Sequence, residues 1–218
     1  MLVDLSHTIT PGMVTYPGLP GPEITEHLTR AETAERMANG VSFTIGRICM
    51  VTNVGTYIDV PYHFYADGDQ LAQVGIERVA DLPAVTVDAS TMTDRGVGTA
   101  AFDGIDVAGK AVLIRTTWDR HFATERYGVD APFVTSAAVD LLVSQGAALV
   151  GIDSVNIDDM GDLSRPAHCG LLRAGIPIVE HLTGLTKLPP AGYSFTAVPP
   201  KFTELGTFPV RAFARLER

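Results

Sequence analysis

Cysteine is scarce in this sequence: the 218 residues contain only two, Cys49 and Cys169, and these are far apart. A disulfide framework is therefore not expected, and two free thiols suit a reducing compartment. Long apolar runs are also missing, since none approaches the roughly 18 to 20 residues of a membrane span. Residues 1–6 lack the charged and apolar regions of a signal peptide. These absences predict a cytoplasmic protein without a membrane partner.

Positive charge is sparse as well. The 16 Lys and Arg are outnumbered by 25 Asp and Glu, which gives a net charge of −9, and they occur singly. No nucleic-acid partner is expected, because phosphate backbones are bound by basic stripes. A hydrophobic share of 46% and a charged share of 19% are typical of a globular protein. A chain of this length can bury a substantial core, so we expect residues 1–218 to form one α/β domain.

The chain alternates between helix-like and strand-like segments. Residues 135–146 predict a helix, with Thr135 or Ser136 at the N-cap and Gly146 at the C-terminal stop, and a buried strand follows at 147–153. Such a helix-to-strand step is the signature of an α/β unit. A short helix is expected at 168–175. Further strands are predicted from β-branched and apolar runs at residues 2–5, 42–51, 82–88, 111–116, 176–180, 193–198 and 208–214.

Residues 53–64 combine a carboxylate, an imidazole, a phenol and a carboxamide in one short stretch. Alternate side chains of an extended segment share one face, so Asn53, Tyr57, Asp59 and His63 converge if the stretch stays roughly extended. Because these polar groups stand among apolar neighbours, we expect a partly buried cluster whose members find polar partners. The spacing alone fits an active-site segment and a hydrogen-bonded structural turn about equally well.

Two later polar residues also stand beside apolar runs, where an isolated charge is costly to bury. His168 follows Arg165 and Pro166, and Glu180 ends the predicted strand at 176–180. An acid at the end of a buried strand has a physical reason to face a site, although single residues of either type are more often solvated or satisfied structurally. His181 could orient the neighbouring Glu180, and the sequence assigns it no other catalytic or ligand role.

The stretch 53–64 resembles the motif His-x-Gly-Thr-His-x-Asp-x-Pro-x-His-Phe of the cyclase family, which contains bacterial kynurenine formamidases and related metal-dependent amide hydrolases. The likeness covers essentially the whole chain. Residues 150–154 resemble the family's Gly-Ile-Asp-Ser/Thr strand, and residues 168–180 resemble its His-x-x-Leu-Leu…Ile-Val-Glu segment. Further similar pieces are Asp4-Leu5-Ser6, Tyr16-Pro17-Gly18 and Pro209-Val210-Arg211.

The resemblance implies a single-domain α/β fold of the swivelling β/β/α type, with a mixed β-sheet and flanking helices, assembled as a homodimer or homotetramer. Family enzymes hold zinc or manganese. Carried over by position, Asp59, His168 and Glu180 match metal ligands, and His63 matches the histidine that serves in acid/base catalysis. The expected reaction is hydrolysis of a small cyclic or N-acyl, formamide-like amide by a metal-activated water.

The two motif histidines are replaced here by Asn53 and Tyr57. An amide oxygen is a weak zinc ligand, and a phenol binds only after losing its proton, so a two-metal site is weakened. The remaining ligands suit one divalent ion, zinc or manganese with iron also possible, while Asn53 or Tyr57 would stabilise the oxyanion. The alternatives are a metal-independent lyase, isomerase or cyclase that uses Tyr57 and His63, and an inactive relative that binds a ligand.

Aromatic side chains at loop positions indicate a pocket for a small-molecule substrate. Tyr16 lies in a stiff loop rich in Pro and Gly, which can hold a ring at a pocket rim. Phe64, Tyr65 and Trp118 are the other candidates, and together they fit a small aromatic or cyclic amide. Plain packing is the competing role for each of these rings.

Overall fold

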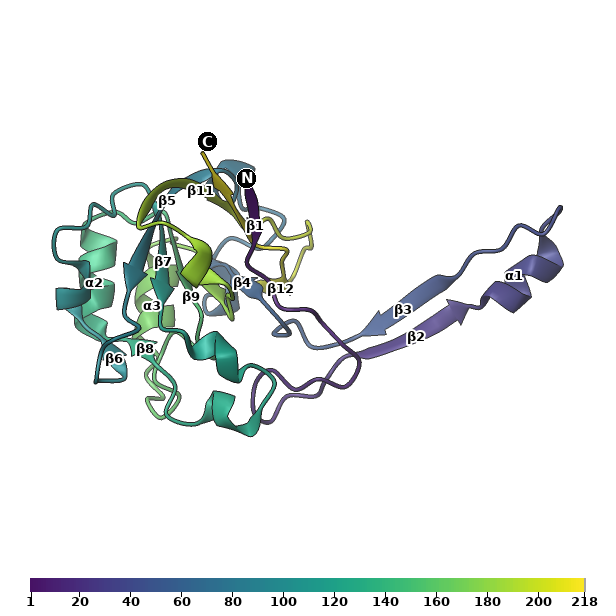
Figure 1. The fold of residues 1–218 in the computed structure, drawn as a ribbon, viewed down its shortest axis with the longest axis horizontal. Helices are drawn as coiled ribbons and strands as arrows, with labels where there is room; N and C mark the ends of the chain where they lie inside the picture. Colours follow the sequence, from purple (N-terminus) through teal and green to yellow (C-terminus); the bar gives the residue numbers. More distant parts are fainter. Residues whose placement is uncertain (218) are drawn as a thin grey trace.

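Nine strands form one mixed, curled β-sheet in the computed structural model, which describes residues 1–217 (Figure 1). The four central strands, β5, β7, β9 and β10, are parallel, and the flanking strands pair antiparallel. In spatial order the strands are β1 (Leu2–Asp4), β13 (Phe213–Leu216), β11 (Ala191–Thr196), β5 (Leu82–Asp88), β7 (Ala111–Arg115), β9 (Leu149–Ile152), β10 (Ile178–Glu180), β4 (Tyr57–Asp59) and β12 (Thr207–Pro209).

Two helices, α2 (Ser136–Ser144) and α3 (Pro166–Arg173), pack against each other and against one face of this sheet. Helix α2 begins where the Thr135 hydroxyl accepts a hydrogen bond from the Ala138 amide. Gly170 allows the two helices to approach closely, because a Cβ there would lie 2.6 Å from Val139. A second apolar cluster, which includes Leu113, Leu149, Val179, Leu182 and Phe195, covers the opposite face.

Short elements connect these layers. A small parallel sheet joins β6 (Gly96–Val97) to β8 (Phe133–Val134). The single-turn 3₁₀ helices are η1 (Pro61–His63), η2 (Ile76–Arg78), η3 (Thr99–Phe102), η4 (Trp118–His121), η5 (Glu125–Gly128) and η6 (Leu185–Lys187). Within residues 1–217, none of the helices has the length and apolar character needed to cross a membrane.

A long arm, residues 23–49, projects away from this body (Figure 1). Strands β2 (Glu23–Leu28) and β3 (Ile45–Cys49) form its two-stranded antiparallel sheet, and helix α1 (Arg30–Arg36) lies at its far end. The arm has almost no interior, since all of β3 and nearly all of β2 are exposed.

Most of the predicted elements are present, and one interpretation was wrong. The strand predicted at 42–51 is confirmed as β3, which lies in the arm. The strand predicted at 208–214 is two strands, β12 and β13, in different halves of the sheet. The chain crosses over between them, where the Val210 amide donates to Thr56 and the Ala212 amide donates to Ser6.

Candidate active site

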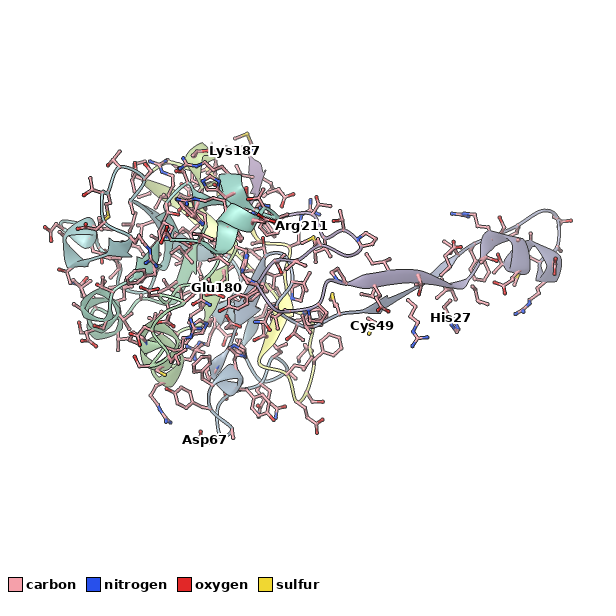
Figure 2. The ribbon with its side chains drawn as sticks, turned by 90° about the horizontal axis from the view of Figure 1, so that it is seen from below. His27, Cys49, Asp67, Glu180, Lys187 and Arg211 are labelled. Carbon is pink, nitrogen blue, oxygen red and sulfur yellow. The ribbon has the colours of Figure 1, made fainter. Side chains whose placement is uncertain are left out.

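The site is built where strands β4 and β10 lie side by side. Their antiparallel register places Tyr57 opposite Glu180 and Asp59 opposite Ile178. Tyr57 and Asp59 are two residues apart in one strand, so both side chains point to the same face. Helix α3 adds His168 and η1 adds His63 to this face. Figure 2 shows Glu180 within the body, well separated from His27 and Cys49 on the arm.

Asp59 is at the centre of the cluster and is completely buried. Its Oδ1 accepts a hydrogen bond of 2.6 Å from the Thr207 hydroxyl, whereas Oδ2 has no hydrogen-bond partner in the described structure. Oδ2 lies 3.7 Å from Nε2 of His168, and Oδ1 lies 3.8 Å from Nε2 of His63. A buried carboxylate oxygen without a donor is costly, so this atom is positioned for a cation.

His168 is held by Asp158 so that its Nε2 faces the other acids. Nδ1 lies 2.6 Å from Oδ2 of Asp158, and the same carboxylate accepts the backbone amides of Ala167 and His168 at the start of α3. Nε2 lies 3.8 Å from Oε1 of Glu180. Burial lowers the pKa of His168, but Asp158, Asp59 and Glu180 outweigh this effect and raise the pKa to about 10.

Glu180 is fully buried and has a partner for each carboxylate oxygen. Oε1 accepts from the Ile157 amide at 2.6 Å, and Oε2 accepts from the Tyr57 hydroxyl at 2.5 Å. Burial raises the pKa of Glu180 to about 7, against the opposing charge of His168. Burial and the nearby Glu180 raise the pKa of Tyr57 well above its ordinary value. The phenol therefore stays protonated and acts as a hydrogen-bond donor.

His63 lies at the more open side of the cluster. Burial lowers its pKa below the ordinary 6.5, although the charge of Asp59 acts in the opposite direction. The imidazole is consequently neutral near pH 7 and can accept a proton. Phe64 follows it and stacks on the His168 ring, with 4.8 Å between ring centroids and 15° between ring planes. Gly206 packs so closely against this turn that a Cβ at position 206 would lie 2.2 Å from the backbone nitrogen of His63.

These side chains suit a divalent metal ion. One ligand atom each from Asp59, His63 and His168 lies within 4.8 Å of the others, and Glu180 adjoins His168. Two imidazoles and a carboxylate are a usual ligand set for zinc and similar ions. The hydrogen bond from His168 to Asp158 is the carboxylate–histidine arrangement that orients a metal ligand, because it directs the other ring nitrogen to the ion. The unpartnered Oδ2 of Asp59 completes the fit.

A pocket of about 260 Å³ opens onto this cluster. Its lining includes Tyr16 and Phe64, two of the aromatic residues predicted for a pocket. Asn53, Tyr57 and His63 from the 53–64 stretch also line it. The full lining is Tyr16, Leu19, Asn53, Tyr57, His63, Phe64, Asn156, Arg165, His168 and Glu180.

The prediction that Trp118 lines the pocket was wrong. Its side chain packs in a separate cluster with Tyr127 and Val155, and its indole nitrogen donates to the Tyr127 carbonyl at 2.8 Å. A buried indole that already has its hydrogen-bond partner serves as packing. Tyr65, the other ring considered, also lies outside the lining and donates its hydroxyl to the Cys169 carbonyl.

Three residues near the pocket were not anticipated as site residues: Asp158, Asn156 and Arg165. Asn156 and Asp158 follow the buried strand β9 closely, and polar residues after a buried strand are a recognisable signal. Arg165 directly precedes the Pro166 that starts α3. Its position in the pocket depends on the path of the loop, which local sequence does not indicate.

A family model and curated relatives both match this chain. The Cyclase family model matches residues 3–159. A kynurenine formamidase from Bacillus cytotoxicus is 27% identical over 214 residues, covering 98% of this chain and 96% of that protein. A kynurenine formamidase from Salinibacter ruber is also 27% identical, over 215 residues, covering 98% of this chain and 97% of that protein.

Solved structures share the fold. Isatin hydrolase A from Ralstonia solanacearum superposes with a TM-score of 0.85 at 22% identity, covering all of this chain and 92% of that one. A predicted metal-dependent hydrolase from Bacillus stearothermophilus gives a TM-score of 0.78 at 26% identity, covering 98% of this chain and 97% of the other.

Proposed function

Because the chain belongs to the Cyclase family, we propose that it is a metal-dependent hydrolase that cleaves the C–N bond of a small cyclic or N-acyl amide. The observation that carries the proposal is the unpartnered Oδ2 of Asp59, 3.7 Å from the oriented Nε2 of His168. Similar proteins support the reaction class, since they are named for hydrolysis of a formamide and of isatin, a cyclic amide.

Asp59 and His168 would hold the ion with Glu180 as the third ligand, which leaves His63 free for proton transfer. A bound divalent ion supplies Lewis acidity, which polarises a carbonyl group and acidifies water. One imidazole, His168, lies next to three acids, Asp59, Asp158 and Glu180. A single protonated imidazole cannot balance three carboxylates, so the cluster attracts a further cation.

The chain's own residues would supply the proton transfers and orientation. Neutral His63 accepts a proton from the attacking water at one ring nitrogen and returns it to the leaving amide nitrogen. Tyr57 stays protonated beside Glu180 and keeps that carboxylate in place. The Asn53 carboxamide lines the pocket and can donate an N–H to the carbonyl oxygen as negative charge develops there. Phe64 fixes the His168 ring by stacking.

The metal-independent lyase or isomerase is less well supported. That reaction would need Tyr57 and His63 as an acid/base pair, but the Tyr57 proton is engaged by Glu180 and its pKa is raised well above 10. Tyr57 could therefore give a proton only by breaking a buried 2.5 Å hydrogen bond. An inactive ligand-binding relative would have no use for an aligned Asp158–His168–Asp59 chain.

Metal analysis combined with hydrolysis assays tests the proposal. We expect the purified protein to bind about one zinc or manganese per chain and to cleave an N-formyl aromatic amine or a lactam. Chelation should remove both the ion and the activity, and reloading should restore them. Asp59→Asn should lose both, whereas Asp67→Asn, an exposed acid on a surface loop (Figure 2), should lose neither. Hydrolysis that persists after complete metal removal would exclude the proposed reaction.

A further inference from the structure

The pocket contains one cationic side chain whose role the metal chemistry does not explain. Arg165 is the single Lys or Arg among the lining residues of the described chain, and it stands half-buried on a wall otherwise shaped by aromatic and polar groups. It immediately precedes α3, so it is fixed relative to His168 three residues later.

The Arg165 guanidinium is poorly satisfied by the protein. Nη1 lies 3.5 Å from both Asn156 Oδ1 and the Asp159 carbonyl, and Nη2 lies 3.4 Å from the Tyr16 hydroxyl. These distances are at the outer limit for hydrogen bonds, and all three partners are neutral. Within residues 1–217 no carboxylate lies within 4.0 Å of it, in contrast to Arg95, Arg115 and Arg211.

The backbone of Arg165 has an unusual conformation. Arg165 has φ 49° and ψ 57°, the left-handed region that a residue other than glycine rarely adopts. The Pro166 ring fixes the start of α3 directly after it. A planar fork with five donors, fixed at a pocket wall and without an anionic partner, is suited to a carboxylate.

We propose that Arg165 binds a carboxylate group of the substrate, with the Tyr16 hydroxyl beside it, so that the enzyme selects anionic amides. This inference rests on the proposed function for its reaction, but the carboxylate site itself can be tested without any turnover. A substrate held in this way has its anionic end at Arg165 and its amide toward the Asp59 and His168 side of the same pocket.

Binding of benzoate and of its neutral isostere benzamide, measured by calorimetry, tests the site directly. We expect the wild type to prefer benzoate by about tenfold or more, since charge-assisted bidentate pairs are strong. Arg165→Met should abolish the preference, and Arg165→Lys should retain part of it. Arg173→Met, which removes a charge from the other end of α3, should leave the preference intact. A wild type without preference, or an Arg165→Met variant that keeps it, overturns the inference.

Kinetics separate this inference from the proposed function. The ratio of kcat/KM for 2-formamidobenzoate to that for formanilide should fall about tenfold or more in Arg165→Met, mainly through KM. An equal loss on both substrates would assign Arg165 a structural role and contradict the proposal. If neither compound is cleaved while the benzoate preference depends on Arg165, the proposed reaction fails and the carboxylate site stands.

Discussion

His168 and His181 are both buried, lie close together in the sequence and carry the same ring, yet the protein shifts their pKa values in opposite directions. Burial lowers the pKa of both. For His168, three carboxylates outweigh burial and bring the pKa to about 10. His181 contacts the Tyr127 hydroxyl at 3.1 Å through Nδ1, has no partner at Nε2 in the described structure, and has a pKa of about 3.

The difference shows that burial alone does not identify a functional histidine. What distinguishes His168 is a carboxylate on each side, Asp158 at Nδ1 and Asp59 with Glu180 at Nε2, which lets a cation occupy the place of a proton. His181 is next to Glu180 in sequence, but it packs among Tyr57, Phe122 and Tyr127. The following experiments test whether that contrast is real.

Replacing His168 should have the largest effect. In His168→Ala, the metal site loses its oriented imidazole and Asp59 faces Glu180 without a cation between them. We expect kcat/KM to fall by about 10³-fold or more, and the metal content to drop close to zero. Metal analysis of the folded variant, verified by circular dichroism, checks this. Full metal content in the variant would mean that His63 and the acids suffice.

Removing only the support of His168 should have an intermediate effect. Asp158→Asn keeps the shape of the side chain but removes the charge that orients Nδ1, so metal affinity should fall by about 10- to 100-fold. Competition with a chelator of known affinity measures it. Asp162→Asn, an exposed acid in the same loop, is the matched control and should be unchanged.

The metal-free protein should lose stability as the pH rises. Since the folded pKa of His168, about 10, exceeds its ordinary value of 6.5, its contribution is complete below pH 6.5 and is lost as the pH rises toward 10. The pKa of Glu180 is raised from 4.5 to about 7, so its contribution to stability is lost mostly as the pH rises from 4.5 to 7, below the interval considered next. Between pH 7 and 9 we expect a loss of about 2 kcal/mol, measured by urea unfolding after chelation. His168→Leu should flatten this dependence, and a stability that rises over the same interval would contradict the pKa assignment.

Replacing His181 should have the smallest effect. His181 has φ 56°, a conformation that Asn tolerates better than most residues, so His181→Asn keeps the backbone. We expect kcat/KM within about threefold of wild type, unchanged metal content, and a stability loss of about 1 to 2 kcal/mol from the cavity. A loss of metal comparable to that in His168→Ala would remove the contrast between the two histidines.

Local patterns predicted much of the fold and part of the site. The strand at 82–88 and the helix capped by Thr135 were correct because a single periodicity and a cap determine them. The sequence could not indicate that 42–51 pairs with residues 23–28 in an arm, because β-branched character gives strand type and not the partner.

The site shows the same limit. Asp59, His63, His168 and Glu180 were predicted as site residues chiefly from the family resemblance, because spacing alone left their role open, and the fold brings them together. Asp158 was missed because its importance comes from meeting the first turn of α3, a contact that no spacing reveals. Trp118 was assigned wrongly because a loop aromatic has the same local appearance whether it lines a pocket or fills a core.

The site is completed by residues that follow all of its other members in the sequence. Thr207 supplies the hydroxyl that holds Asp59, Gly206 packs on the His63 turn, and β12 forms the outer edge beside β4. A nascent chain that ends before residue 206 carries Asp59, His63, His168 and Glu180 but cannot fix the first two of them. Capture of a cation is therefore expected only after residues 206 and 207 have been added, and a chain that ends at residue 205 should lose its metal site while keeping every ligand.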